Sequence, residues 1–172
     1  MAKNIFYING YRANGESTKH IKLTQLLDME VKLAKYIYKE NNIEEIRETV
    51  KDADLIIASS TGAYLARDIC YSYNIPLISL NPVIDLQETF SKIGVKAPNI
   101  KNGNSKNLLE LIICTKDDEL IDHRKTLELF KDKRVTLIKN GGHRMIYLEP
   151  IKDDILDFIQ SIELPLYSIF NC

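Results

Sequence analysis

Short apolar runs alternate with longer amphipathic stretches along most of this chain of 172 residues. The runs have the length of strands and are apolar at nearly every position, as is typical of strands buried on both faces of a parallel sheet. Between them, apolar residues recur at helical spacing, for example Ile43, Ile46 and Val50. The pattern predicts one α/β domain over residues 1–172, in which helices cover both faces of a mostly parallel sheet of about six strands.

Six segments are predicted as strands and five as helices. The strands are 4–8, about 33–38, 54–58, 77–80, 109–114 and 135–139. One helix is expected to follow its N-cap, Ser17, because a serine side chain can accept a bond from the first free N–H groups. The other helices are 43–50, 61–71, about 123–131 and 151–162.

Residues 82–107 do not follow this alternation. They contain Gly94, Pro98 and Gly103 and only a short helical stretch at 86–90, which together indicate an excursion over the edge of the sheet. Ligands bind to α/β sheets near the carboxyl ends of the strands. The segment is therefore either a plain surface loop or a cap or wall of a substrate site.

The composition narrows the class of protein. Hydrophobic residues make up 45% of the chain, and 23 basic residues balance 24 acidic ones for a net charge of −1. A soluble globular domain is expected, without the basic surface that nucleic acid requires. No apolar run approaches the ~20 residues that span a bilayer. Residues 1–4 lead into the first strand without the layout of a signal peptide, so we expect a cytoplasmic protein with no membrane attachment.

The three cysteines, Cys70, Cys114 and Cys172, lie far apart in the sequence. Their number is odd, and their spacing matches neither a disulfide framework nor a zinc site. We therefore expect free thiols in a reducing compartment, with neither a metal nor another cofactor.

The third predicted strand runs into a helix through the small residues of 58–62. A nucleophilic serine at such a turn needs small residues two positions before and after it, because strand and helix pass closely there. Ser60 has Ala58 and Gly62 at these positions, whereas Ser59 is flanked by bulky β-branched residues. If either serine is a nucleophile, the pattern favours Ser60. The alternative is that the hydroxyl groups simply cap the helix.

An acidic loop and a histidine follow later strands. One predicted strand ends at the acidic loop 117–122, and the next ends at a Gly-rich turn that carries His143. Serine, acid, histidine is the chain order of α/β-hydrolases, in which the histidine takes the serine proton and the acid orients the histidine. Asp118 is preferred as the acid because 118–121 resembles the segment that follows the acid-bearing strand in such hydrolases, with Asp117 as the rival. Otherwise the acids form a solvated loop and His143 bonds to backbone.

Acyl transfer also needs N–H groups that face the developing oxyanion. The first strand ends at Gly10, which allows the chain to turn, and we expect the backbone N–H groups of Tyr11 and Thr61 to take this role. Arg12 and Met145 are predicted to line the substrate pocket. An arginine there would attract an anionic group of a substrate, unless its guanidinium is simply solvated.

Two further features of the sequence carry no chemistry in this interpretation. The segment 10–17 has the glycine and serine spacing of a P-loop, but Glu16 stands in the place of the lysine and would repel phosphate, which argues against nucleotide binding. His20 and His123 lie within predicted helices and are expected at the surface.

A family resemblance rests on five segments: 6–11, 58–62, 80–82, 115–122 and 141–143. Together they resemble the small, lidless α/β-hydrolases of the YqiA type, which are bacterial esterases of similar length. The resemblance implies a single α/β-hydrolase domain with little or no lid and a catalytic triad of Ser60, Asp118 and His143. This chain departs from the family in having Asn9 in place of the usual histidine and Ala58 in place of glycine.

The leading hypothesis is a serine esterase or thioesterase that acts on a small-molecule acyl substrate through an acyl-enzyme. One alternative is a binding or regulatory protein without catalysis on the same scaffold. Another is an amidase or peptidase that uses the same three residues. The apolar residues of 163–172 are expected to pack on the body of the domain or on a second subunit, as in a homodimer.

Overall fold

The computed structural model describes residues 4–11, 17–37, 42–100 and 107–168, and of 163–168 only the backbone. One sheet of six parallel strands runs through the described chain in the order β2-β1-β3-β4-β5-β6. The strands are β1 (Ile5–Ile8), β2 (Val31–Ala34), β3 (Leu55–Ser59), β4 (Leu77–Leu80), β5 (Glu110–Thr115) and β6 (Arg134–Ile138). The predicted class, a parallel α/β sheet, is confirmed.

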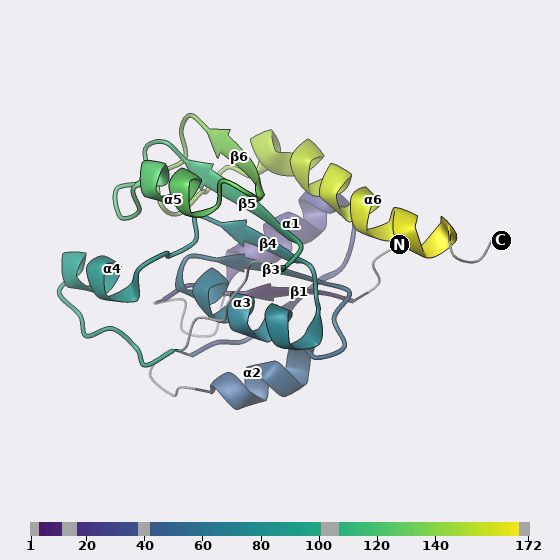
Figure 1. Ribbon diagram of the computed structural model, residues 1–172, viewed down its shortest axis with the longest axis horizontal. Coiled ribbons are helices and arrows are strands. Elements are labelled where there is room, and N and C mark those ends of the chain that lie inside the picture. Colours follow the sequence, from purple (N-terminus) through teal and green to yellow (C-terminus); the bar gives the residue numbers. More distant parts are fainter. Residues whose placement is uncertain (1–3, 12–16, 38–41, 101–106, 169–172) are drawn as a thin grey trace.

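Helices cover the sheet on both faces, with α1 and α6 on one side and α2 and α3 on the other (Figure 1). The helices are α1 (Thr18–Leu27), α2 (Ile43–Val50), α3 (Thr61–Tyr73), α4 (Leu86–Lys92), α5 (His123–Leu129) and α6 (Lys152–Ser168), the last preceded by the 3-10 turn Glu149–Ile151. No helix in the described part of the chain is long and apolar enough to cross a membrane.

The two faces of the sheet have separate hydrophobic cores, because side chains of a strand alternate between the faces. In β1, Ile5 and Tyr7 pack with α1 and α6, whereas Phe6 and Ile8 pack with α2 and α3. All four are buried. The continuous apolar runs of the sequence are therefore the consequence of a sheet that is buried on both sides.

Five of the six strands lie within one residue of their predicted ends, and β2 is the exception. Its predicted span of 33–38 was wrong, because the strand occupies Val31–Ala34, where it pairs in register with the four residues of β1. Tyr36, within the predicted span, is buried without belonging to the strand. An apolar pattern indicates which residues are buried, but the length of β2 is set by its pairing with the four-residue strand β1.

The predicted helices are present, with ends that differ by several residues. Ser17 caps α1 as expected, since its Oγ accepts a hydrogen bond of 3.0 Å from the N–H of Lys19. The helix expected at 151–162 continues to Ser168. The packing expected for the side chains of 163–172 lies outside the described residues. Between β4 and β5, the chain forms the short helix α4 within the segment that broke the alternation.

A buried ion pair joins α3 to the start of β5. The Nε of Arg67 lies 3.0 Å from Oε1 of Glu110, and the two side chains are 1% and 0% exposed. Ser79 of β4 donates a hydrogen bond of 2.5 Å to the same oxygen, and the Arg67 guanidinium stacks over the ring of Phe130 at 4.4 Å. A charge here has no access to water, so each partner depends on the other.

Replacing Glu110 by leucine is expected to lower the free energy of unfolding by about 3–5 kcal/mol, because it leaves the Arg67 guanidinium buried without its counter-charge. Adding Arg67→Met to the same protein is expected to restore much of that stability. Urea unfolding of the wild type, the single variant and the double variant measures both effects. A single variant as stable as the double variant would contradict the account.

Candidate active site

Several of the predicted site residues meet in a cleft at the carboxyl ends of the parallel strands. This cleft has a volume of about 1000 Å³ and is lined by Ser60 and Thr61 from the β3–α3 turn, by Tyr11 after β1 and by His143 after β6. Parallel strands bring all their carboxyl ends to one edge of the sheet, where separate loops can converge. Residues far apart in the sequence therefore reach the same space.

Ser60 occupies the turn between β3 and α3 in a strained conformation, with φ of 53° and ψ of −124°. Its backbone is held by the end of β4, because its N–H donates to the carbonyl of Leu80 at 3.0 Å and its carbonyl accepts from the N–H of Val83 at 3.2 Å. Non-glycine residues persist in such conformations only when surrounding contacts enforce them. The turn has the form of a nucleophile elbow.

Two glycines allow the close approach that this turn requires. A Cβ atom on Gly62 would lie 2.1 Å from the carbonyl oxygen of Asn9, and a Cβ on Gly10 would lie 2.9 Å from Cβ of Ser60. Both distances are shorter than real carbon contacts. The small residue at position 62 therefore lets the start of α3 pass the end of β1, as the sequence pattern indicated.

A chain of hydrogen bonds links Ser60, His143 and Asp118. The Oγ of Ser60 lies 2.8 Å from Nε2 of His143, and Nδ1 of His143 lies 2.9 Å from Oδ2 of Asp118. The Asp118 side chain is only 2% exposed. An ionised carboxylate can only accept, so Nδ1 carries the proton and Nε2 of the neutral ring accepts from the serine hydroxyl.

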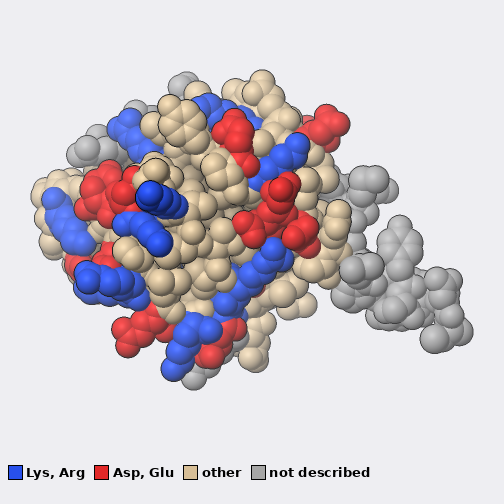
Figure 2. Space-filling view, turned by 90° about the horizontal axis from the view of Figure 1, so that it is seen from above, with Lys and Arg blue, Asp and Glu red and all other residues tan. Residues whose placement is uncertain are grey.

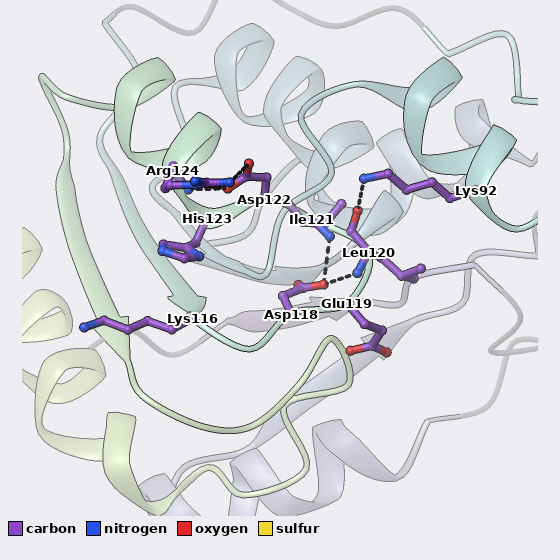
Figure 3. A pocket seen from close by; sticks show the side chains of 9 residues that line it. All are labelled: Lys92, Lys116, Asp118, Glu119, Leu120, Ile121, Asp122, His123 and Arg124. Carbon is purple, nitrogen blue, oxygen red and sulfur yellow. Dashed lines mark hydrogen bonds and ion pairs between the residues drawn. The ribbon is translucent and has the colours of Figure 1, made fainter.

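Backbone groups orient the Asp118 carboxylate toward the ring. Its Oδ1 accepts hydrogen bonds of 2.8 Å from the N–H groups of both Leu120 and Ile121 (Figure 3). The acidic loop is also tied to α4, since Nζ of Lys92 donates to the carbonyl of Leu120 at 2.7 Å. The same loop lines a smaller pocket of about 390 Å³, which Figure 3 shows from close by.

The two acids beside Asp118 hold the backbone of the histidine turn. The carboxylate of Asp117 accepts from the N–H groups of Gly141 and Gly142 at 3.1 and 2.9 Å, and Glu119 accepts from the N–H of His143 at 2.9 Å. The bonds from Gly142 and Gly141 lower the pKa of Asp117. Asp117, the rival acid, therefore binds the turn and not the ring.

Asn81 and Thr115 hold the carbonyl groups of the same turn. Nδ2 of Asn81 donates to the carbonyls of Gly142 and His143 at 2.9 and 3.1 Å, and Thr115 Oγ1 donates to that of Gly142 at 3.1 Å. Oδ1 of Asn81 also accepts from the N–H of Thr115 at 2.8 Å. Both residues lie in the segments 80–82 and 115–122 that carry the family resemblance, but their contact with the histidine turn was not predicted, because only tertiary structure brings Asn81, which follows β4, to position 142.

The remaining predicted site residues have different placements. Tyr11 and Thr61 line the cleft, as does Met145, although Met145 is fully buried among core residues. Arg12 lies outside the described residues. His20, expected at the surface, is half-buried and lines the cleft.

The described cysteines are poor candidates for a nucleophile. Cys70 and Cys114 are both buried, and burial raises the pKa of Cys114 to about 11 and that of Cys70 well above its usual value. Both therefore remain protonated at neutral pH. Within the described residues, no group of three or more His, Cys, Asp or Glu side chains could hold a metal ion.

Comparison with known proteins gives one family and a common fold. A family model described as an uncharacterised protein family, UPF0227, matches residues 4–160. No curated protein matches the chain. Among solved structures, a protein of Xanthomonas campestris described as a candidate hydrolase of the α/β superfamily is 14% identical, with a TM-score of 0.71 over 91% of this chain and 98% of that one.

Two other solved structures are similar in the same way. The ydeN gene product of B. subtilis is 13% identical, with a TM-score of 0.68 over 92% of this chain and 99% of that one. A second Xanthomonas campestris protein, described as an α/β serine hydrolase without a lid, is 12% identical, with a TM-score of 0.58 over 94% and 83% of the two chains. These likenesses establish an α/β-hydrolase fold.

Replacing Gly62 by alanine is expected to destabilise the protein by about 3 kcal/mol or more, because the new Cβ would overlap the backbone of Asn9. Gly94→Ala is the matched control. Gly94, unlike Gly62, has a positive φ, of 67°, but no atom lies within 4 Å of the added carbon, so only about 1–2 kcal/mol of backbone strain is expected. Urea unfolding of both variants checks the difference, and equal losses would refute the proposed close approach.

Proposed function

This chain belongs to the uncharacterised protein family UPF0227, and on that premise we propose that it is a serine hydrolase that cleaves carboxylic esters or acyl thioesters. The observation that carries the proposal is the hydrogen-bonded chain from Ser60 through His143 to Asp118, with distances of 2.8 and 2.9 Å. The α/β-hydrolase fold and the strained turn at Ser60 support it. The fold by itself would be equally compatible with a binding protein.

In the proposed reaction, Nε2 of His143 takes the hydroxyl proton of Ser60 as Oγ attacks the acyl carbonyl. The imidazolium that forms is stabilised by Asp118, and it then gives the proton to the leaving alcohol or thiol. This leaves the acyl group on Ser60. A water molecule, activated by the same histidine, attacks the acyl-enzyme and releases the acid.

The developing oxyanion is proposed to bind to the N–H groups of Thr61 and Tyr11. Thr61 is the first residue of α3, so its N–H has no partner within the helix and lies at the positive end of the helix dipole. Tyr11 directly follows Gly10, whose backbone packs against the side chain of Ser60. Both residues line the cleft.

An apolar wall in the cleft supports an acyl substrate. The rings of Tyr11 and Phe90 lie 5.0 Å apart in a tilted contact, and Ile93 and Leu120 line the cleft with them. Phe90 belongs to α4, so the segment that broke the strand and helix alternation supplies part of a substrate wall. Hydrocarbon placed against this wall would be removed from water next to the proposed nucleophile.

Labelling with a fluorophosphonate probe tests whether Ser60 is activated. The wild type is expected to react, Ser60→Ala to show no labelling, and Ser59→Ala to keep most of it. Ser59 is the matched control because its Oγ is within 2.6 Å of the Tyr7 hydroxyl and does not contact His143 among the described bonds. Folded wild type that fails to label would favour a non-catalytic scaffold, and matched ester and amide substrates would separate an esterase from an amidase.

Substitution of the two neighbouring acids distinguishes their roles. Asp118→Asn is expected to lower kcat for an activated ester by about 10³–10⁴-fold, because the amide no longer holds the correct ring tautomer. Asp117→Asn removes an acceptor for two backbone N–H groups but leaves the ring partner in place, so we expect a loss of about tenfold or less. Steady-state kinetics of both purified variants measures this, and a larger loss in Asp117→Asn would reverse the assignment.

A further inference from the structure

The wall of the cleft beside the histidine turn is basic. Lys19 and Lys22 of α1, Lys35 after β2 and Arg144 next to His143 all line the cleft, and Glu119 is the one acidic residue among the described lining. The Glu119 carboxylate already accepts the backbone N–H of His143. Positive charge is therefore in excess among the described residues that line the cleft.

These cations lack carboxylate partners within the described part of the chain. None of the ion pairs found there includes Lys19, Lys22, Lys35 or Arg144. Nζ of Lys19 donates to the carbonyl of Arg144 at 2.7 Å, and Nζ of Lys22 to that of Ile146 at 3.4 Å. Each ammonium group has three donors, so donors remain for a ligand in the cleft.

The lowered pKa of Lys19 is consistent with an anion-binding role for the two lysines. Burial, and after it the positive charge of Lys22, lowers the pKa of Lys19 to about 8. An anion placed between the two ammonium groups would offset both effects. The molecule does not concentrate one sign of charge everywhere, because acidic and basic side chains intermingle on the face that Figure 2 shows. Both signs of charge occur together on that face, whereas the described lining of the cleft has four lysine or arginine residues and one acid.

We propose that the cleft selects esters that carry a carboxylate or phosphate group in addition to the scissile bond, and that Lys19 and Lys22 bind this anionic group. The inference rests on the proposed function for the position of the ester at Ser60. Hydrocarbon of the same substrate lies against the apolar wall of Tyr11, Phe90 and Ile93. The two lysines then distinguish a charged substrate from a neutral one of equal size.

Kinetics with matched substrate pairs tests this selection. In the acyl arm, the mono-4-nitrophenyl ester of octanedioic acid is compared with its terminal amide. In the leaving-group arm, the butyrate ester of 4-hydroxybenzoate is compared with that of 4-hydroxybenzamide. We expect the wild type to prefer the anionic member of at least one pair by about tenfold or more in kcat/KM, and that arm identifies which part of the substrate carries the charge.

Variants show whether the two lysines cause the preference. The double variant Lys19→Gln and Lys22→Gln keeps donors but loses charge, and it is expected to reduce the preference at least fivefold, mainly through a higher KM for the anionic ester. Lys19→Arg should retain the preference. Lys51→Gln is the control, because Lys51 follows α2 and does not line the cleft. Added salt should weaken the preference of the wild type.

Each outcome decides between the alternatives. Hydrolysis of both members at equal rates, or a preference unchanged in the double variant, overturns the anion site but leaves the serine hydrolase intact. If no ester is hydrolysed, calorimetry of the Ser60→Ala protein with hexyl phosphate and with hexanol decides. Binding of hexyl phosphate alone, lost on replacing both lysines, would support the anion site without the hydrolase, and no binding would overturn both.

Discussion

The position of His143 is the constraint on which this site depends, because the residue lies in a turn and no strand or helix holds it. Three consecutive acids and one asparagine fix that turn. Asp117 and Glu119 accept hydrogen bonds from its backbone N–H groups, Asp118 accepts one from the ring nitrogen, and Asn81 donates to its carbonyls. Each bond contributes only about 1 kcal/mol. Together they provide partners for the N–H groups of residues 141–143 and for the carbonyls of residues 142 and 143. The ring thereby stays in reach of Ser60.

The serine is positioned by a different kind of constraint, which is steric. The end of β1 passes very close to the turn at Ser60 and to the start of α3, and only small residues allow this approach. Gly62, for example, leaves no room for a Cβ atom beside the carbonyl of Asn9. The elbow conformation is unfavourable for serine. It is maintained by the packing of the sheet and by the bonds from β4, so the stability of the core sustains the strained residue.

The serine turn and the histidine turn both line the cleft, and the rest of its lining includes apolar and basic residues. Helix α4 and Tyr11 contribute apolar surface, while α1 and the residue after the histidine contribute positive charge. A site with one apolar and one basic wall suits a substrate with hydrocarbon at one part and an anion at another. The buried ion pair of Arg67 and Glu110 lies away from the cleft lining and holds α3, the helix that begins at the serine, against the sheet.

The sequence by itself determined the fold class and five of the six strands, because burial on both faces is a local property. It also predicted that Ser60 lies in the turn between a strand and a helix, and that an acidic loop and His143 follow later strands, as they do in the structure. Tertiary structure alone decided that Asp118 contacts the ring while Asp117 and Glu119 hold the turn, that Asn81 reaches residue 142, and that lysines of α1 line the same cleft as the serine. Such contacts join residues far apart in the chain, and neither periodicity nor propensity encodes which side chain of an acidic run points to which partner.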